Sequence, residues 1–192
     1  MTAVAIADQP VPTIQWSNLW WVAASAVITV VVVQSHDFWL LNFVHVLSGL
    51  MWTGIDLFMG FVIGPIMRRL DPAARRAFTM RLMPRMLFIM PTLAAVASTA
   101  GWFLAVQRGY LDLPFPALWW VIAALLIVTI LTIQGFAILL PTNIRVYLEL
   151  RGGEPDMAKI GRLMRLYIVV VASQGVMQIG IIVVMARFAT GL

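Results

Sequence analysis

The chain has 192 residues, of which 62% are hydrophobic and only 11% charged, and it carries a formal net charge of +5. A soluble domain is nearer half apolar and a quarter charged, so this composition indicates an integral membrane protein. The chain contains no cysteine, which excludes disulfides, thiolate metal sites and a covalently attached c-type haem. Its basic residues gather in two loops, so the positive charge needs no nucleic acid as a partner.

Five apolar segments are each long enough to cross a bilayer, which takes about 20 residues. They cover residues 17–34, 38–67, 86–106, 117–140 and 164–188. We therefore predict an all-α fold, a polytopic membrane bundle of about five transmembrane helices. Residues 1–16 are expected to form a cytoplasmic or interfacial segment without a cleaved signal peptide, and residues 17–192 a single transmembrane domain.

The basic residues predict the orientation of this bundle. The loop after the second segment carries Arg68, Arg69, Arg75, Arg76, Arg81 and Arg85, and the loop after the fourth carries Arg145, Arg151, Lys159, Arg162 and Arg165. Both loops lie on the same side of a five-helix bundle, and the positive-inside rule makes that side cytoplasmic. The N-terminus is therefore expected inside and the C-terminus outside.

Prolines predict where these helices begin or break. Asp71 followed by Pro72 predicts a helix start with Asp71 as the N-cap. Pro84 and Pro91 bracket the start of the third segment and predict a bend or an interruption there. Pro141 predicts the end of the fourth segment, or a kink before an interfacial extension.

The second segment concentrates the candidate functional residues. At 100° per helical residue, His45, Trp52 and Asp56 fall within about 20° of one line, and Gly49 lies about 40° away. An ionisable side chain in hydrocarbon costs roughly 2.5–3.5 kcal/mol, so such a face usually turns toward the protein interior. We expect the function to lie on this face.

His45 has the chemistry of an axial haem ligand, because neutral imidazole is the usual protein ligand of haem iron. The alternative is a histidine that is hydrogen-bonded to a neighbouring helix or points into the interface. The only other histidine is His36, too near in the same part of the chain for both to clamp one haem. A six-coordinate iron therefore needs a methionine, another side chain, or a histidine from a second copy or a partner subunit.

Asp56 is a candidate proton relay or substrate contact. The favoured alternative is a structural ion pair with Arg85, at the cytoplasmic start of the third segment, which fixes packing without chemistry.

Methionines recur at helical spacing around the start of the third segment, at Met80, Met83, Met86 and Met90. Thioethers bind Cu(I), but methionine is also the adaptable filler of helix contacts.

Other polar and small residues lie within the apolar segments. The amides of Gln134, Gln174 and Gln178 predict interhelical hydrogen bonds, or else the lining of a pocket for a quinone or another polar-headed ligand. Gly60 and Gly64 form a GxxxG pattern, which permits close approach of a helix or a subunit.

The motif His45-x3-Gly49-x2-Trp52-x-Gly54 resembles the first-helix motif of a broad group of small bacterial membrane proteins. That group includes the copper-resistance D family, the membrane domain of the membrane-anchored urate oxidases (urate hydroxylases) and, more distantly, the haem-binding membrane protoporphyrinogen oxidases. The urate-oxidase pattern is echoed further at Phe58 to Pro65, Leu82-Met-Pro84-Arg85, Thr99-Ala-Gly101 and Pro141-Thr-Asn143-Ile-Arg145. The resemblance covers roughly residues 38–165.

This resemblance implies a compact helical bundle in the bacterial inner membrane, with His45 as the ligand of haem b and Gly49 and Trp52 on the haem-facing surface. The chain departs from the group because it lacks the cytochrome c domain of the urate oxidases. It also has only apolar residues around 120–125, where the protoporphyrinogen oxidases carry an intramembrane lysine. Whether it is an enzyme stays open.

Three functions follow as hypotheses. The leading one is a haem b-binding redox or electron-transfer subunit that uses His45 and works in a homo-oligomer or a larger membrane complex. The second is a cofactor-free structural or assembly subunit of such a complex. The third is copper transport through His45 and the methionine cluster.

Overall fold

The computed structural model describes residues 13–152 and 155–191, and this part of the chain is helical with no strand. The first helices are a 3-10 turn η1 (Trp16–Asn18), α2 (Leu19–Gln34), α3 (Phe38–Phe58), a π-helical segment η2 (Met59–Ile63) and α4 (Gly64–Arg69). They are followed by α5 (Pro72–Gln107), a 3-10 turn η3 (Tyr110–Asp112), α6 (Leu118–Ile133), a second π-helical segment η4 (Gln134–Leu139), α7 (Leu140–Arg151) and α8 (Met157–Ala189).

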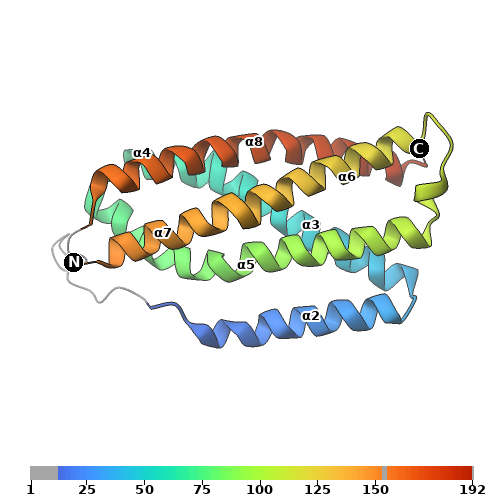
Figure 1. The fold of residues 1–192 in the computed structure, drawn as a ribbon, viewed down its shortest axis with the longest axis horizontal. Helices are drawn as coiled ribbons and strands as arrows, with labels where there is room; N and C mark the ends of the chain where they lie inside the picture. Colours follow the sequence, from blue (N-terminus) through green and yellow to red (C-terminus); the bar gives the residue numbers. More distant parts are fainter. Residues whose placement is uncertain (1–12, 153–154, 192) are drawn as a thin grey trace.

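These elements form five rods that run along the same axis (Figure 1). The rods cover Trp16–Gln34, Phe38–Arg69, Ala73–Gln107, Leu118–Arg151 and Ala158–Ala189, and each is long and apolar enough to span a membrane. The predicted all-α bundle with five membrane-spanning helices is confirmed. Large apolar side chains cover its outside, and Trp20, Phe61 and Val176 are 72%, 73% and 72% exposed. In water such a surface is unfavourable, whereas lipid tails solvate it.

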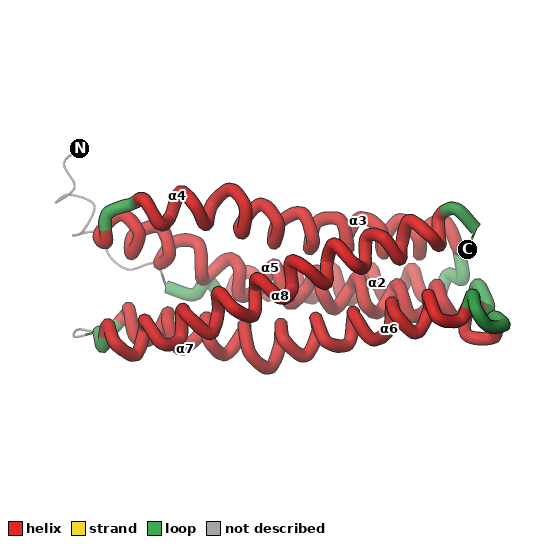
Figure 2. The backbone as a smooth tube through the Cα atoms, turned by 90° about the horizontal axis from the view of Figure 1, so that it is seen from above, coloured by secondary structure: helices red, strands yellow, loops and turns green. Residues whose placement is uncertain are grey.

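The rods pack as a central antiparallel pair with neighbours on either side. α3 packs most extensively against α5, and α6 packs mainly against α8. α2 lies at the edge of the bundle against α5 and α3 (Figures 1 and 2). The α4–α5 and α7–α8 connections lie at the same end of the bundle, so both arginine-rich stretches are gathered there.

Three clusters of buried apolar residues follow one another along the bundle. The cluster nearest the arginine-rich end contains Met80, Met83, Val146, Tyr147, Leu150 and Ile160. The middle cluster contains Trp52, Ala94, Ala97 and Leu131, and the cluster at the opposite end contains Val32, Leu41, Ala100 and Leu104. The small residues of α5 let α3 approach its backbone closely.

The start of α5 follows the prediction, but its interior does not. The Asp71 carboxylate caps the helix by accepting a hydrogen bond of 2.9 Å from the backbone N–H of Ala74. The interruption considered at Pro84 and Pro91 is wrong, because both prolines lie inside one helix of 36 residues. Membrane helices tolerate proline because neighbouring helices re-satisfy the backbone groups that it frees.

The fourth rod does not end at Pro141 but continues through η4 and α7 to Arg151. η4 ends two residues before Pro141, and η2 likewise ends two residues before Pro65. Proline lacks an N–H and its ring clashes with the carbonyl four residues earlier, so widening of the preceding turn relieves that clash. The same local sequence chemistry thus gives both rods a π-helical turn.

Candidate functional site

His45 lies on α3 and is bound to the neighbouring α5. Its Nδ1 is 2.9 Å from the backbone carbonyl oxygen of Ala97. A carbonyl oxygen only accepts hydrogen bonds, so Nδ1 carries the hydrogen, and in a neutral ring Nε2 is then the nitrogen with the free lone pair. This is the helix-to-helix hydrogen bond considered as the alternative to a haem ligand. It is equally the bond that orients metal-ligating histidines, so it is compatible with both.

Gly101 makes the space that the His45 ring occupies. A Cβ atom at residue 101 would lie 2.7 Å from Cε1 and 2.9 Å from Nδ1 of His45, closer than any side chain tolerates. The sequence marked Gly101 only as part of a small-residue stretch, and its role in seating the imidazole was missed. Only the packing of α3 on α5 identifies it.

The four residues that share one face of the second segment separate into two regions. His45 and Asp56 are eleven positions apart, which at 1.5 Å per residue is about 16 Å along the helix. Trp52 and Asp56 line an internal cavity, and neither His45 nor Gly49 belongs to its lining. At Gly49, an added Cβ would meet nothing within 4 Å.

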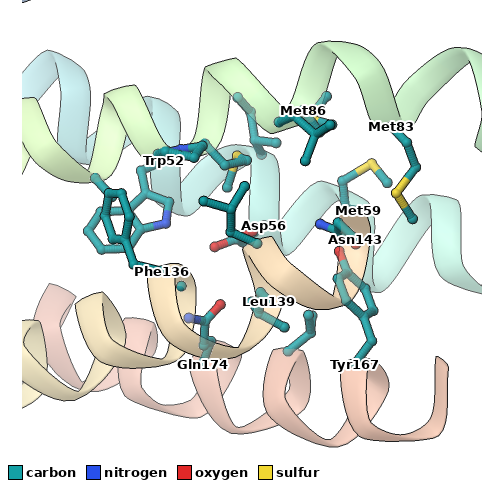
Figure 3. A pocket seen from close by; sticks show the side chains of 18 of the residues that line it. Trp52, Asp56, Met59, Met83, Met86, Phe136, Leu139, Asn143, Tyr167 and Gln174 are labelled. Carbon is teal, nitrogen blue, oxygen red and sulfur yellow. The ribbon is translucent and has the colours of Figure 1, made fainter. Parts of the chain in front are cut away.

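The cavity has a volume of about 110 Å³ and lies between α3, α5, η4, α7 and α8 (Figure 3). Its wall is mainly apolar, with Trp52 and Phe136 as its aromatic residues. The polar side chains in the wall are Asp56, Thr132, Asn143, Tyr167 and Gln174. Both π-helical segments contribute to it, η2 through Met59 and η4 through Gly135, Phe136 and Leu139. Such segments frequently occur at functional sites.

Asp56 is held by an amide and an indole. Its Oδ2 accepts a hydrogen bond of 2.6 Å from Nε2 of Gln178, and the Trp52 side chain donates a second hydrogen bond to the carboxylate. Gln178 is only 1% exposed, so this contact joins α3 to α8 inside the bundle.

The predicted ion pair between Asp56 and Arg85 is not formed. Across the described residues, the ion pair present is Lys159 with Glu149, at the arginine-rich end. Asp56 shares the cavity with Met86, and the neighbouring position 85 lies 100° further round α5. Arg85 is therefore exposed on another side of that helix.

The three glutamines all make hydrogen bonds between helices, as the favoured interpretation proposed. Nε2 of Gln134 donates to Oγ of Ser173 at 3.1 Å, and Nε2 of Gln174 donates to the carbonyl oxygen of Leu131 at 3.2 Å. Gln174 also lines the cavity, so for this residue the second interpretation applies as well.

Buried oxygen atoms near the cavity lack hydrogen-bond donors. The side-chain atoms without a partner are Ser98 Oγ, Gln134 Oε1, Asn143 Oδ1 and Gln178 Oε1. Asn143 is hydrogen-bonded to the Tyr167 side chain, and since its oxygen has no partner, its NH₂ group makes that contact. A buried polar atom left unsatisfied costs about 1–3 kcal/mol, so such atoms are normally met by water or a ligand.

The methionines divide between the cavity and the core. Met83, Met86 and Met90 line the cavity, whereas Met80 packs against Tyr147 in the buried cluster near the arginine-rich end. Met59 was missed, because in an apolar segment nothing distinguishes it until the helices are packed.

The GxxxG glycines lie at and just after η2. A Cβ atom at Gly60 would meet nothing within 4 Å, so no helix of this chain uses that surface for close approach. Across the described residues there is also no group of three or more His, Cys, Asp or Glu side chains placed to hold a metal ion.

No protein-family model, curated protein or solved structure matches the chain. The family resemblance and the assignment of haem b therefore stay predictions.

Proposed function

We propose that this is a multi-pass protein of the bacterial inner membrane, with its N-terminus in the cytoplasm. The arrangement of the bundle supports this orientation, since both arginine-rich connections lie at one end. Reporter fusions at the two termini test it, and we expect cytoplasmic activity at the N-terminus and periplasmic activity at the C-terminus. The reverse result would overturn the orientation.

We further propose that the protein binds haem b through His45 and passes electrons to a partner. The observation that supports this is the hydrogen bond from Nδ1 of His45 to Ala97, which orients the ring and leaves Nε2 as the ligating nitrogen. Bound iron supplies one-electron redox chemistry, while the protein supplies the ring orientation and the apolar surroundings.

A porphyrin fits the outside of α3 and not the internal cavity. Cofactor pockets measure roughly 300–1,000 Å³, well above the cavity volume of about 110 Å³. The open space at Gly49 lets a flat ring approach the α3 backbone beside His45. Trp52, which the resemblance placed on the haem-facing surface, belongs instead to the cavity. A haem on the outer surface is completed by a second copy or a partner subunit.

A reduced-minus-oxidised optical spectrum of the detergent-purified protein tests the proposal. We expect a b-type signal that His45→Ala removes and His36→Asn preserves. His36 is the matched control, because it is the only other histidine and its positive φ of 54° suits asparagine. Absence of the signal after expression with adequate haem would reject haem binding.

A cofactor-free structural or assembly subunit is the second candidate. The observation favouring it is the open, exposed surface at Gly60, where a helix of another chain has room to approach. Co-purification of stoichiometric partners without a chromophore selects this function. A b-type spectrum in the isolated chain rejects it.

Copper transport is the third candidate, favoured by four cavity methionines, Met59, Met83, Met86 and Met90. His45 is remote from that cavity, so any Cu(I) there would be bound by thioethers and Asp56 alone. Cu(I) titration of the Met83/Met86/Met90 triple leucine variant tests this function, and unchanged binding would dismiss it.

A further inference from the structure

We propose that the cavity binds the head group of a hydroquinone, with one hydroxyl donating to the Asp56 carboxylate and the other to Oδ1 of Asn143. The site concerned is the cavity between α3, α5, η4, α7 and α8, separate from His45 (Figure 3). The inference does not depend on haem binding.

The position of the cavity selects a lipid-soluble ligand. Asp56 is twelve residues from Arg68, the first arginine of the arginine-rich end, which is about 18 Å along the second rod. The cavity lies between spans, and most of its wall is apolar with a few polar side chains. That combination is typical of ligand pockets, where the apolar wall supplies affinity and the polar groups fix orientation.

The size and the wall of the cavity suit a single ring. A cavity of about 150 Å³ in another protein holds benzene, and this one measures about 110 Å³. Trp52 and Phe136 offer aromatic faces. The unbranched side chains of Met59, Met86 and Met90 can adjust to ring substituents, and their sulfur atoms contact aromatic rings favourably. A two-ring head group exceeds this space.

The hydrogen-bonding groups distinguish the reduced ligand from the oxidised one. The nearby amide N–H groups are already used within the protein, by Gln178 toward Asp56, by Gln174 toward Leu131, and by Asn143 toward Tyr167. What remains toward the cavity is the Asp56 carboxylate and the unpartnered Asn143 oxygen, while the hydroxyls of Thr132 and Tyr167 either donate or accept.

A hydroquinone carries two O–H donors, and a quinone carries two carbonyl acceptors. Acceptors facing acceptors leave buried lone pairs unsatisfied, which disfavours the quinone. The reduced form is therefore the ligand that the cavity complements.

The direct test is equilibrium binding of a single-ring probe to the full-length protein in detergent. The probes are decyl-ubiquinol, kept reduced under argon, and decyl-ubiquinone, both measured by titration calorimetry. We expect saturable binding, with the reduced probe at least about tenfold tighter than the oxidised one. Equal binding, tighter binding of the oxidised form, or no saturable binding would overturn the proposal.

Two variants make the test specific to the assigned atoms. Asp56→Asn exchanges an acceptor for an amide that can donate, so we expect it to weaken the reduced probe at least about tenfold and to leave or strengthen binding of the oxidised probe. Asn143→Leu removes the second acceptor and is expected to lower the preference for the reduced probe toward unity. A reduced-to-oxidised ratio unchanged in both variants would contradict the assignment, and mere misfolding weakens both probes alike.

Ser98→Ala is the matched control. Ser98 Oγ is also buried without a partner, but Ser98 does not line the cavity, so both affinities should stay unchanged. Repeating the titration in His45→Ala separates this inference from haem binding, because hydroquinone binding should persist there.

Discussion

The two halves of α3 carry two kinds of site. His45 is packed against the α5 backbone, with no cavity around it, and its hydrogen bond goes to a main-chain carbonyl. Asp56 faces an internal cavity and is held by the side chains of Gln178 and Trp52. One site is thus built from backbone and small residues, and the other from side chains of several helices. Substitutions should disturb them in different ways.

The largest effect is expected at Gly101. Gly101→Ala puts a Cβ atom within 2.9 Å of Nδ1 of His45, which forces the imidazole away from Ala97. We expect a loss of about 1–3 kcal/mol in the free energy of unfolding, measured by SDS titration in mixed micelles. Gly49→Ala is the control and should not destabilise, since a Cβ there meets nothing within 4 Å. Equal effects of the two variants would contradict the packing described for His45.

The next effect concerns the pairing of Asp56 with Gln178. Gln178→Leu leaves the carboxylate without its 2.6 Å donor, and we expect destabilisation of about 1–3 kcal/mol. The double variant Asp56→Leu/Gln178→Leu removes both partners and should recover most of that loss, because no buried polar group is then orphaned. Additive losses in the double-mutant cycle would mean that the two side chains are not coupled.

A smaller effect is expected at Gln134, on the outer side of the cavity region. Gln134→Leu removes one hydrogen bond to Ser173, and the Ser173 hydroxyl keeps its bond to the Val170 carbonyl. Interhelical hydrogen bonds in membranes average about 0.6 kcal/mol, and we expect a loss of that size by the same SDS titration. A loss as large as that of Gln178→Leu would show that Gln134 also supports the cavity.

The smallest effect is expected at Arg85. The exposed arginine is not paired with Asp56, so Arg85→Ala should change the free energy of unfolding by less than about 0.5 kcal/mol. If the two residues formed the buried pair expected from the sequence, the loss would be about 3–5 kcal/mol. Thermal unfolding in detergent distinguishes these outcomes.

The sequence predicts the rods well because membrane thickness and cap chemistry act locally. Residues 17–34 and 38–67 match helices of the structure closely, and the Asp71 cap forms as expected. Proline was harder to interpret, because the same residue lies within a continuous helix at Pro84 and follows a π-helical turn at Pro141. Which outcome occurs depends on the neighbouring helices.

The candidate site was predicted in part. Helical periodicity placed His45 and Asp56 on one face, but it carries no information about which α5 residue stands opposite. The α3–α5 register decides that His45 meets Gly101 and that Asp56 meets the methionines rather than Arg85. Gln178, 122 positions along the chain from Asp56, becomes its partner only when α8 closes the bundle.

The account's central claim is that His45 and Asp56 serve separate sites. Reduced-minus-oxidised spectra of the native protein, His45→Ala and Asp56→Asn test it most directly. We expect a b-type signal in the native protein and in Asp56→Asn, and none in His45→Ala. A signal that survives His45→Ala, or that disappears in stably folded Asp56→Asn, would contradict the claim.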